Sequence, residues 1–405
     1  MNEDDSRAVQ TISDHLIELG LRQAPVARQM EQFCEQLLAL GVPLLRGNVS
    51  ARTMHPLIDS VSHVWHRGKG VETNANTLEQ AASARWQKSP LRHIVENIDT
   101  RLQRTDLTDP EKTSPWPVFE EFRAEGATEH LAKLIGFGVD GTISEKTGVM
   151  LTWLTDRPGG FEDRDIAILQ RLMPRLALSV KSTVDHKIAR NLLRTYVGDH
   201  ASEEILAGDY RRGSFQTIPA AILFADLRDF TTISGHLERV AMAELLNRCF
   251  DAIVAPIRQH GGEVLKFLGD GLLAVFDRRD HEAADICFGA LHAAVEAVAA
   301  VAAIDRPETP GRVMELDIAL HLGDVLYGNI GAADRLDFTV LGPAVNEASR
   351  IESLCSGLGR SVLISESFAL AAQHCSDRII RVGEHHLRVT EGMQVLYALK
   401  DEPTQ

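Results

Sequence analysis

The sequence is poor in cysteine and in basic charge. Its 405 residues contain five cysteines, an odd number, and none of them forms a Cys-x-x-Cys pair. This argues against a disulfide framework and against a cysteine metal site. Lys and Arg number 42 against 57 Asp and Glu, which gives a formal net charge of −15. We therefore expect reduced, buried cysteines and no nucleic-acid partner.

The sequence also lacks a long hydrophobic run. Its longest stretch poor in polar residues, around 292–304, is too short to span a bilayer, and "MNEDDSRAVQ" has neither a basic nor an apolar leader region. Hydrophobic residues make up 44% and charged residues 24%, as in ordinary globular proteins. These features predict a cytoplasmic protein with no membrane partner.

The N-terminal part begins with a helical pattern over residues 9–45, in which apolar residues recur at spacings of three and four. Shorter segments separated by turn signals follow to residue 154 and predict strands with connecting helices. From residue 163 one apolar stripe runs through Leu169, Leu176 and Val184, so we expect a long helix. It is either a domain-capping helix or a parallel dimeric signalling helix that joins two modules.

An α/β alternation starts after residue 217. Strands are predicted at 220–227, 263–268, 272–276, 315–323, 324–331 and 361–365, and helices at 239–260, which a glycine pair ends, 281–303 and 344–354. The tight "GDG" turn after residue 268 is typical of a hairpin. The order β-α-β-β-α-β is the ferredoxin-like arrangement, with additions at the C-terminus.

Five polar residues of this half stand where chemistry is possible. Asp226 closes a strand and Asp270 lies at the hairpin tip, and two carboxylates at neighbouring strand ends can hold a pair of divalent cations. Asn346 and Arg350 share one helix face and could point together at a phosphate. Lys266 lies between apolar neighbours on a predicted strand. Each of the five residues also has a plainer interpretation. Either aspartate could form a turn or a helix cap, Asn346 and Arg350 could form a polar helix face, and Lys266 could point to solvent from an edge strand.

Three segments in this order, "FADLRDFT", "EVLKFLGDGLLAVF" and "DFTVLGPAVNEASRIES", resemble the signatures of the class III nucleotidyl cyclase catalytic domain. The resemblance covers residues 218–399. It implies a homodimer with active sites at the subunit interface, where one subunit gives the metal-binding aspartates and the other gives base-reading and transition-state residues.

The resemblance also implies a role for each matching position. Asp226 and Asp270, with the carbonyl of Leu227, would bind two Mg²⁺ or Mn²⁺ ions. Lys266 would read the adenine N1, and Thr339 holds the place of the second base-reading residue, which is Asp in many members and Thr in a subgroup. Asn346 would orient the ribose and Arg350 would stabilise charge on the α-phosphate. The pair Lys266 and Thr339 favours ATP over GTP.

Two positions depart from the family pattern. Pro343 follows the glycine of "VLG", where many relatives have Asp, and Arg388 stands where a C-terminal lysine usually contacts the phosphates. Arginine keeps the positive charge, so we expect Arg388 to bind phosphate. Arg335 is a second candidate for a phosphate contact.

The segment "MLTWLTDRPGGFEDRDIAILQRLMPRLALSV" resembles the closing strand, loop and helix of a GAF-type sensor domain. It implies an α/β domain with a possible small-molecule ligand. No cysteine lies between Cys34 and Cys249, which argues against a thioether-linked chromophore. His63, His66 and His93 could ligate haem or a metal, but such histidines are more often ordinary core or surface residues.

We therefore predict an α/β (α+β) protein: a GAF-like sensor domain over residues 1–185, a linking helix over 186–217, and a ferredoxin-like cyclase domain over 218–399. The predicted activity is conversion of ATP to cyclic AMP, regulated by the sensor. Two alternatives stay open, a guanylate cyclase and a catalytically silent cyclase-like module that binds nucleotide and transmits a signal.

Overall fold

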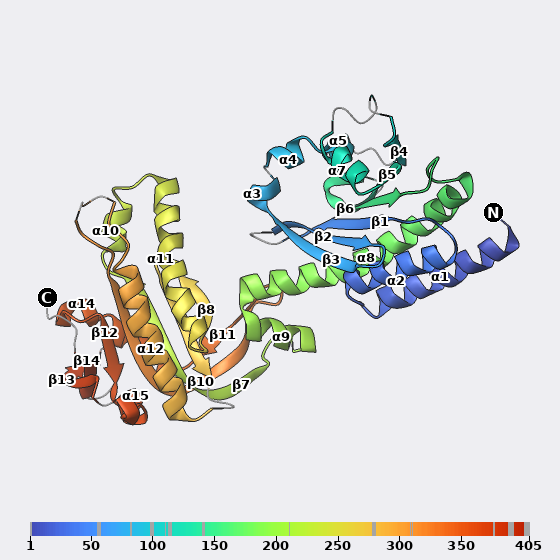
Figure 1. Ribbon diagram of the computed structural model, residues 1–405. Coiled ribbons are helices and arrows are strands. Elements are labelled where there is room, and N and C mark those ends of the chain that lie inside the picture. Colours follow the sequence, from blue (N-terminus) through green and yellow to red (C-terminus); the bar gives the residue numbers. More distant parts are fainter. Residues whose placement is uncertain are drawn as a thin grey trace. The chain divides into compact units, whose positions relative to one another are not determined.

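The computed structural model describes the chain except for residues 1, 55–57, 82, 98–100, 110, 112–115, 140–141, 210, 278–280, 308, 310, 376, 388–392 and 401–405. It divides into two compact units, Met1–Leu192 and Leu193–Gln405 (Figure 1). We describe each unit by itself. The domain boundaries that the sequence predicts, 1–185, 186–217 and 218–399, stay a prediction.

The first unit is an antiparallel sheet with helices on it. Its helices are α1 Glu3–Leu21, α2 Val26–Ala39, α3 Leu78–Ala81, α4 Ala84–Gln87, α5 Pro90–Glu96, α7 Val118–Ala124 and most of α8 Asp163–Val197. Its strands are β1 Arg46–Arg52, β2 Ile58–His66, β3 Gly70–Thr77, β4 Gln103–Asp106, β5 Glu129–Val139 and β6 Thr142–Thr155. The strand order among the described residues is β3-β2-β1-β6-β5-β4.

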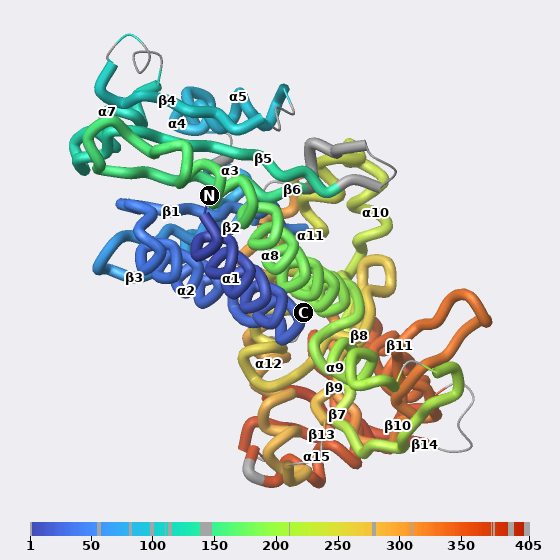
Figure 2. The backbone as a smooth tube through the Cα atoms, turned by 90° about the vertical axis from the view of Figure 1, so that its right-hand side faces the viewer, coloured from blue at the N-terminus to red at the C-terminus, as the bar shows by residue number. Residues whose placement is uncertain are grey.

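Helices cover the sheet of the first unit. Both views show α1, α2 and α8 on one face and α5 and α7 on the other (Figures 1 and 2). Phe33 of α2, Trp153 of β6 and Leu172 of α8 are fully buried in the core between them. The predicted helical start and the predicted strands up to residue 154 are confirmed, and this arrangement is consistent with the GAF-like domain, which stays a prediction.

Helix α8 has two different halves. The apolar stripe predicted from the sequence is buried from Ile168 to Val180, and beyond Thr183 no described residue of the helix is buried. Pro174 lies inside the helix. The long helix is therefore confirmed, and its packing free energy comes from its first half.

The second unit is an α/β structure. Its helices are α9 Asp199–Ala207, α10 Phe230–Ser234, α11 Arg239–Gln259, α12 Ala283–Val301, α13 Pro343–Glu352, α14 Cys355–Leu358 and α15 Glu366–Ala371, with a 3₁₀ turn at Gln373–Cys375. Its strands are β7 Phe215–Leu227, β8 Glu263–Leu268, β9 Gly271–Asp277, β10 Leu316–Gly331, β11 Leu336–Leu341, β12 Val362–Ser365, β13 Ile379–His386 and β14 Met393–Leu399.

The predicted β-α-β-β-α-β order is confirmed by β7, α11, β8, β9, α12 and β10. Antiparallel pairing gives the core order β10-β7-β9-β8, and β12, β14 and β13 extend it beyond β10. Alternate residues of β7 face opposite cores, since Leu223 packs with α11 and α12 while Ile222 packs in a second cluster with α9 and α13.

Two features differ from the sequence prediction, and the predicted C-terminal additions are present. The strands expected at 315–323 and 324–331 form one continuous strand, β10, because β7 pairs with it from Leu316 to Gly328 without interruption. Strand β11, which pairs with the end of β10, was not predicted. The C-terminal additions are the antiparallel pair β13 and β14.

One helix of the described chain, α12, is long and apolar enough to cross a membrane when judged by length and composition alone. The apolar stretch is thus longer than the 292–304 run suggests. Ile286, Leu291 and Ala297 of this helix are buried in the core of the second unit. All five cysteines are buried and reduced, as predicted.

Candidate functional site

The two candidate metal ligands lie at the same end of the central strands. Strand β7 runs between β9 and β10, and Asp226 pairs with Gly271 on one side and with Asp317 on the other. Leu268 pairs with Gly271, so Gly269 and Asp270 form a two-residue hairpin turn. Gly269 has φ of +73°, as the first central position of a type II′ turn requires. The predicted hairpin is confirmed, and it brings Asp270 next to Asp226.

Close packing explains why residue 271 is a glycine. A Cβ atom there would lie 2.5 Å from the carbonyl oxygen of Ala225 and 2.6 Å from Oδ1 of Asp226. Any side chain would therefore displace the Asp226 carboxylate. The glycine lets the hairpin tip approach β7 closely enough for the two aspartates to interact.

The carboxylate of Asp226 is electrostatically unfavourable in this position. Burial and the negative charges of Asp270 and Asp317 raise the pKa of Asp226 to about 6. Among the described residues, the carboxylates of Asp226 and Asp270 have no hydrogen bond and no ion pair. The described residues also contain no group of three or more His, Cys, Asp or Glu side chains that could hold a metal ion. Two hard oxygen donors that repel each other suit a divalent cation.

Two further acidic residues, which the sequence analysis missed, belong to this cluster. Asp317 is held by Arg228, whose Nε lies 3.1 Å from both carboxylate oxygens and whose Nη1 lies 2.7 Å from Glu315. Glu352, at the end of α13, has its pKa raised to about 7 by burial and by the charges of Asp226, Asp317 and Asp270. Arg228 therefore compensates Asp317, while Asp226, Asp270 and Glu352 lack such compensation within the described chain.

Lys266 is not buried as its apolar neighbours suggested. It lies on β8, at the end of the strand order, and its side chain is 44% exposed, so the edge-strand interpretation describes its position. Its ammonium group forms an ion pair with Asp337 of β11, not with Asp270. Asp337 is a residue that the sequence analysis missed, and its place two residues before Thr339 on one strand was the available signal.

The remaining predicted residues lie on β11, β7 and α13. Thr339 is half-buried on β11 and pairs with Gly328, on the same face of the strand as Asp337. Asn346 is exposed and Arg350 half-buried on α13, one turn apart and so on one face. The side chain of Leu227 is buried at the end of β7, so only its backbone could bind a cation.

Pro343 and Arg388 depart from the family pattern, and Arg335 is the second candidate for a phosphate contact. Pro343 is the first residue of α13, a position that suits proline because its missing N–H is not needed there. Arg335 is exposed before β11, and its carbonyl accepts a hydrogen bond from the N–H of Ala332. Arg388 lies outside the described residues, so its contact with phosphate stays a prediction.

The candidate histidines of the first unit have ordinary partners. Nδ1 of His63 lies 2.8 Å from the Thr73 hydroxyl, and Nδ1 of His93 lies 3.2 Å from the amide of Asn97. His66 is half-buried at the end of β2. In the described part of the chain these three histidines gather no metal-binding group.

Comparison with known proteins finds similarity over the second unit. Residues 214–401 match the model of the family described as "Adenylate and Guanylate cyclase catalytic domain". An "Adenylate cyclase" of Anabaena cylindrica is 34% identical over 161 residues, which is 38% of this chain and 31% of that protein. "Adenylate cyclase 1" of Rhizobium meliloti (strain 1021) is 34% identical over 163 residues, 39% of this chain and 23% of that protein.

One solved structure aligns with part of the chain. The adenylyl cyclase CyaB from P. aeruginosa aligns with 47% of this chain and 97% of its own, at 24% identity and a TM-score of 0.42. The matched part spans less than a third of the length of the two curated relatives. The family match over residues 214–401 agrees with the cyclase resemblance that the sequence analysis gives for residues 218–399.

The raised pKa of Glu352 predicts how stability depends on pH. The unfolded carboxyl loses its proton near pH 4 and the folded one only near pH 7, so folding is weakened as pH rises through this window. With divalent cations removed, Glu352→Gln should therefore raise the melting temperature at about pH 8 and leave it nearly unchanged at about pH 5. Thermal unfolding of wild type and variant at both pH values measures the difference.

Glu244→Gln is the matched control, because Glu244 is exposed on α11. It should change the melting temperature equally little at both pH values. An equal effect of Glu352→Gln at both pH values would contradict the electrostatic interpretation of the cluster.

Proposed function

We propose that this chain, whose residues 214–401 belong to the family of adenylate and guanylate cyclase catalytic domains, is an adenylate cyclase. The oxygen of the ATP 3′-hydroxyl would attack the α-phosphorus, the bond to pyrophosphate would break, and the hydroxyl proton would leave to solvent. The products would be 3′,5′-cyclic AMP and pyrophosphate. The observation that carries the proposal is one hairpin that presents Asp270 beside Asp226 and Lys266 on its other strand.

Asp226 and Asp270, with the Leu227 carbonyl, would hold two Mg²⁺ or Mn²⁺ ions. The mutual repulsion that raises the pKa of Asp226 to about 6 supports this fit, because bound cations would relieve it. When bound, such ions lower the pKa of the 3′-hydroxyl and neutralise the triphosphate. The aspartates' own contribution is to hold that charge at the ends of β7 and β9.

Lys266 and Thr339 would select the base. A lysine donates hydrogen bonds and cannot accept them, so it suits the unprotonated N1 of adenine and disfavours the protonated N1 of guanine. Asp337, the ion-pair partner of Lys266, directs the ammonium group toward β11, the strand that carries Thr339. We propose that Asp337 is a positioning residue for base recognition.

Residues of α13 would act on the sugar and the phosphates. Asn346 would orient the ribose, and Arg350, one turn later on the same face, would stabilise the charge that develops on the α-phosphate. Arg335 and Arg388 would bind the remaining phosphate charge. None of these residues needs to move a proton, so their work is positioning and electrostatic stabilisation.

A homodimer would complete each active site. Phe267 is 51% and Leu268 is 40% exposed on β8, and Leu336 and Leu341 of β11 are exposed too. Apolar side chains gathered on adjacent strands favour a protein partner. In this dimer Asp270 would serve one site and Lys266 the other, so each charge would meet its own part of the substrate. The N-terminal unit would regulate the rate, and we place the protein in the cytoplasm.

Activity of the full chain tests the proposal directly. Purified protein should convert ATP to cyclic AMP with Mg²⁺ or Mn²⁺ and should use GTP poorly, because Lys266 discriminates by one hydrogen bond. Arg350→Ala should lower the rate about 10²-fold, as for other positioned charge donors. Folded protein without product under either metal would favour the silent module. Faster turnover of GTP would favour a guanylate cyclase. In an adenylate cyclase, Lys266→Glu with Thr339→Cys should shift the preference from ATP toward GTP.

Complementation tests the shared sites. Lys266→Ala and Asp270→Ala should each be weakly active alone, whereas a mixture should regain about one quarter of wild-type activity, because about half of the dimers are mixed and each has one intact site of two. Cyclic AMP formation after subunit exchange measures this. Each variant mixed with itself is the control. A mixture no more active than its components, despite proven exchange, would contradict the proposed division.

A double-mutant cycle tests Asp337. Asp337→Asn should raise KM for ATP roughly two- to fivefold with little change in kcat, the size expected of an exposed ion pair. Added to Lys266→Ala it should have no further effect, since its partner is gone. Discrimination between ATP and GTP should fall in the single variant. An equal loss in both backgrounds would mean that Asp337 acts independently of Lys266.

A further inference from the structure

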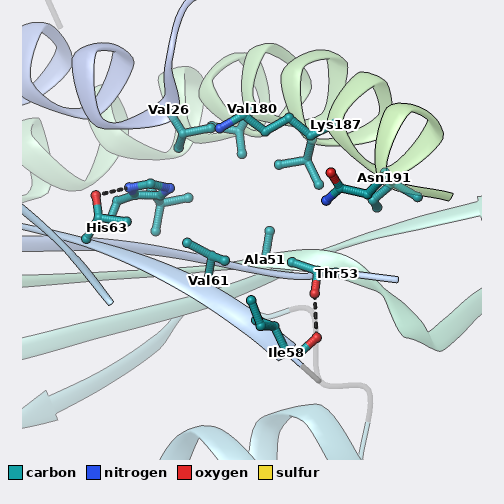
Figure 3. Close-up of a pocket in the computed structure, with 13 residues that line it drawn as sticks. Val26, Ala51, Thr53, Ile58, Val61, His63, Val180, Lys187 and Asn191 are labelled. Atoms are coloured by element: carbon teal, nitrogen blue, oxygen red, sulfur yellow. Dashed lines mark hydrogen bonds between the residues drawn. The ribbon is translucent and has the colours of Figure 1, made fainter. Parts of the chain in front are cut away.

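A cavity in the first unit has no role in the proposed chemistry. It lies between β1, β2 and β3 of the sheet and the helices α2 and α8, and its volume is about 180 Å³ (Figure 3). Most of its lining is aliphatic, as with Val49, Ala51 and Val61 from the sheet and Val180, Val184 and Ile188 from α8. An apolar cavity of about 150 Å³ takes up benzene. This one has room for a single ring or a short branched chain that carries one small substituent.

The polar part of the lining carries no acidic side chain. It consists mainly of the buried His63 of β2 and of Lys187 and Asn191, which are exposed on α8. Figure 3 shows the Lys187 side chain running back along α8 toward Val180, above His63. Among the described residues Lys187 has no ion pair, whereas Lys181 on the same helix is paired with Asp185.

His63 stays uncharged beside this lysine. Burial and the Lys187 charge lower its pKa to about 4, and its Nδ1 already shares a hydrogen bond of 2.8 Å with the Thr73 hydroxyl. Near His63 the lining thus offers an ammonium group that has no ion-pair partner among the described residues, while the Asn191 amide lies on the opposite side of the cavity (Figure 3). A carboxylate suits the ammonium group, because it accepts its hydrogen bonds and balances its positive charge.

We infer that this cavity binds a small monocarboxylic acid whose apolar body is about the size of a benzene ring. The hydrocarbon would lie among the valines, and the carboxylate would lie against the ammonium group of Lys187. Helix α8 provides five of the thirteen lining residues, and these residues, from Val180 to Asn191, span the turns beyond which no described residue of the helix is buried. Bound ligand would extend the packed part of α8 by about two turns.

The regulatory consequence of this site rests on the proposed function. Helix α8 continues without a break to Val197, so its last residues belong to the second unit. A ligand that orders residues 184–191 favours conformations in which α8 is straight and packed at this point, and it changes the cyclase rate if those conformations differ in activity. Binding itself does not depend on the cyclase activity.

Titration of the full chain with benzoate tests the inference, with heat of binding as the readout. Benzoate should bind and benzamide, its neutral analogue, should bind at least tenfold more weakly. Lys187→Met keeps the length of the side chain and removes the charge, so it should lower benzoate affinity roughly tenfold or more. Arg190→Met, an exposed charge on α8 outside the cavity, is the matched control and should leave affinity unchanged.

A second variant tests the cavity body. Val184→Phe fills the space and should abolish binding, while circular dichroism shows whether the fold is kept. No binding of benzoate to wild type, equal binding to Lys187→Met, or equal affinity for benzamide would each overturn the inference. Cyclic AMP formation with and without benzoate separates the two proposals: binding by a chain that makes no cyclic nucleotide refutes the proposed enzyme and leaves the site standing.

Discussion

The antiparallel pairing of β7 with β9 and β10 is the constraint on which the site depends. Its register sets Asp226 opposite Gly271 on one side and opposite Asp317 on the other. Because Asp270 directly precedes Gly271, the three acidic residues Asp226, Asp270 and Asp317 meet at one end of the sheet. A shift by one residue would turn each of them to the opposite face. The buried alternation along β7, with Leu223 in one core and Ile222 in the other, makes such a shift costly. Core packing therefore fixes the charges.

Basic side chains of the second unit neutralise only some of these negative charges. Arg228 compensates Asp317 and Glu315, while Asp226 and Glu352 keep raised pKa values. A protein selected for stability alone would have no reason to leave them so, because each such group weakens folding at neutral pH. Uncompensated carboxylates held by a rigid register are typical of a site whose counter-charge comes from outside the chain.

The sequence predicted what local pattern determines, and it missed what long-range geometry determines. The hairpin at Gly269 and the helix that carries Asn346 and Arg350 follow from turn chemistry and helical period. The ion pair of Lys266 joins residues 71 positions apart, and Glu352 meets Asp226 across more than a hundred, so neither follows from spacing. The two strands predicted within 315–331 form one strand, because pairing with β7 continues through Gly323 and Asp324. Taken alone, the pair Gly-Asp is typical of a turn.

Helix α8 of the first unit shows the same difference between local pattern and long-range packing. The spacing of its apolar residues predicts the helix, but which part of the helix is buried depends on segments far away in the sequence. Residues up to Thr183 are held by the sheet and by α1 and α2, while no described residue of the helix beyond it is buried and Tyr196 is 80% exposed. An exposed helical segment of about 14 residues is marginally stable by itself. Its conformation is thus sensitive to small additional contacts. The cavity lies where the buried half ends, so a ligand there would act on the part of α8 that the fold stabilises least.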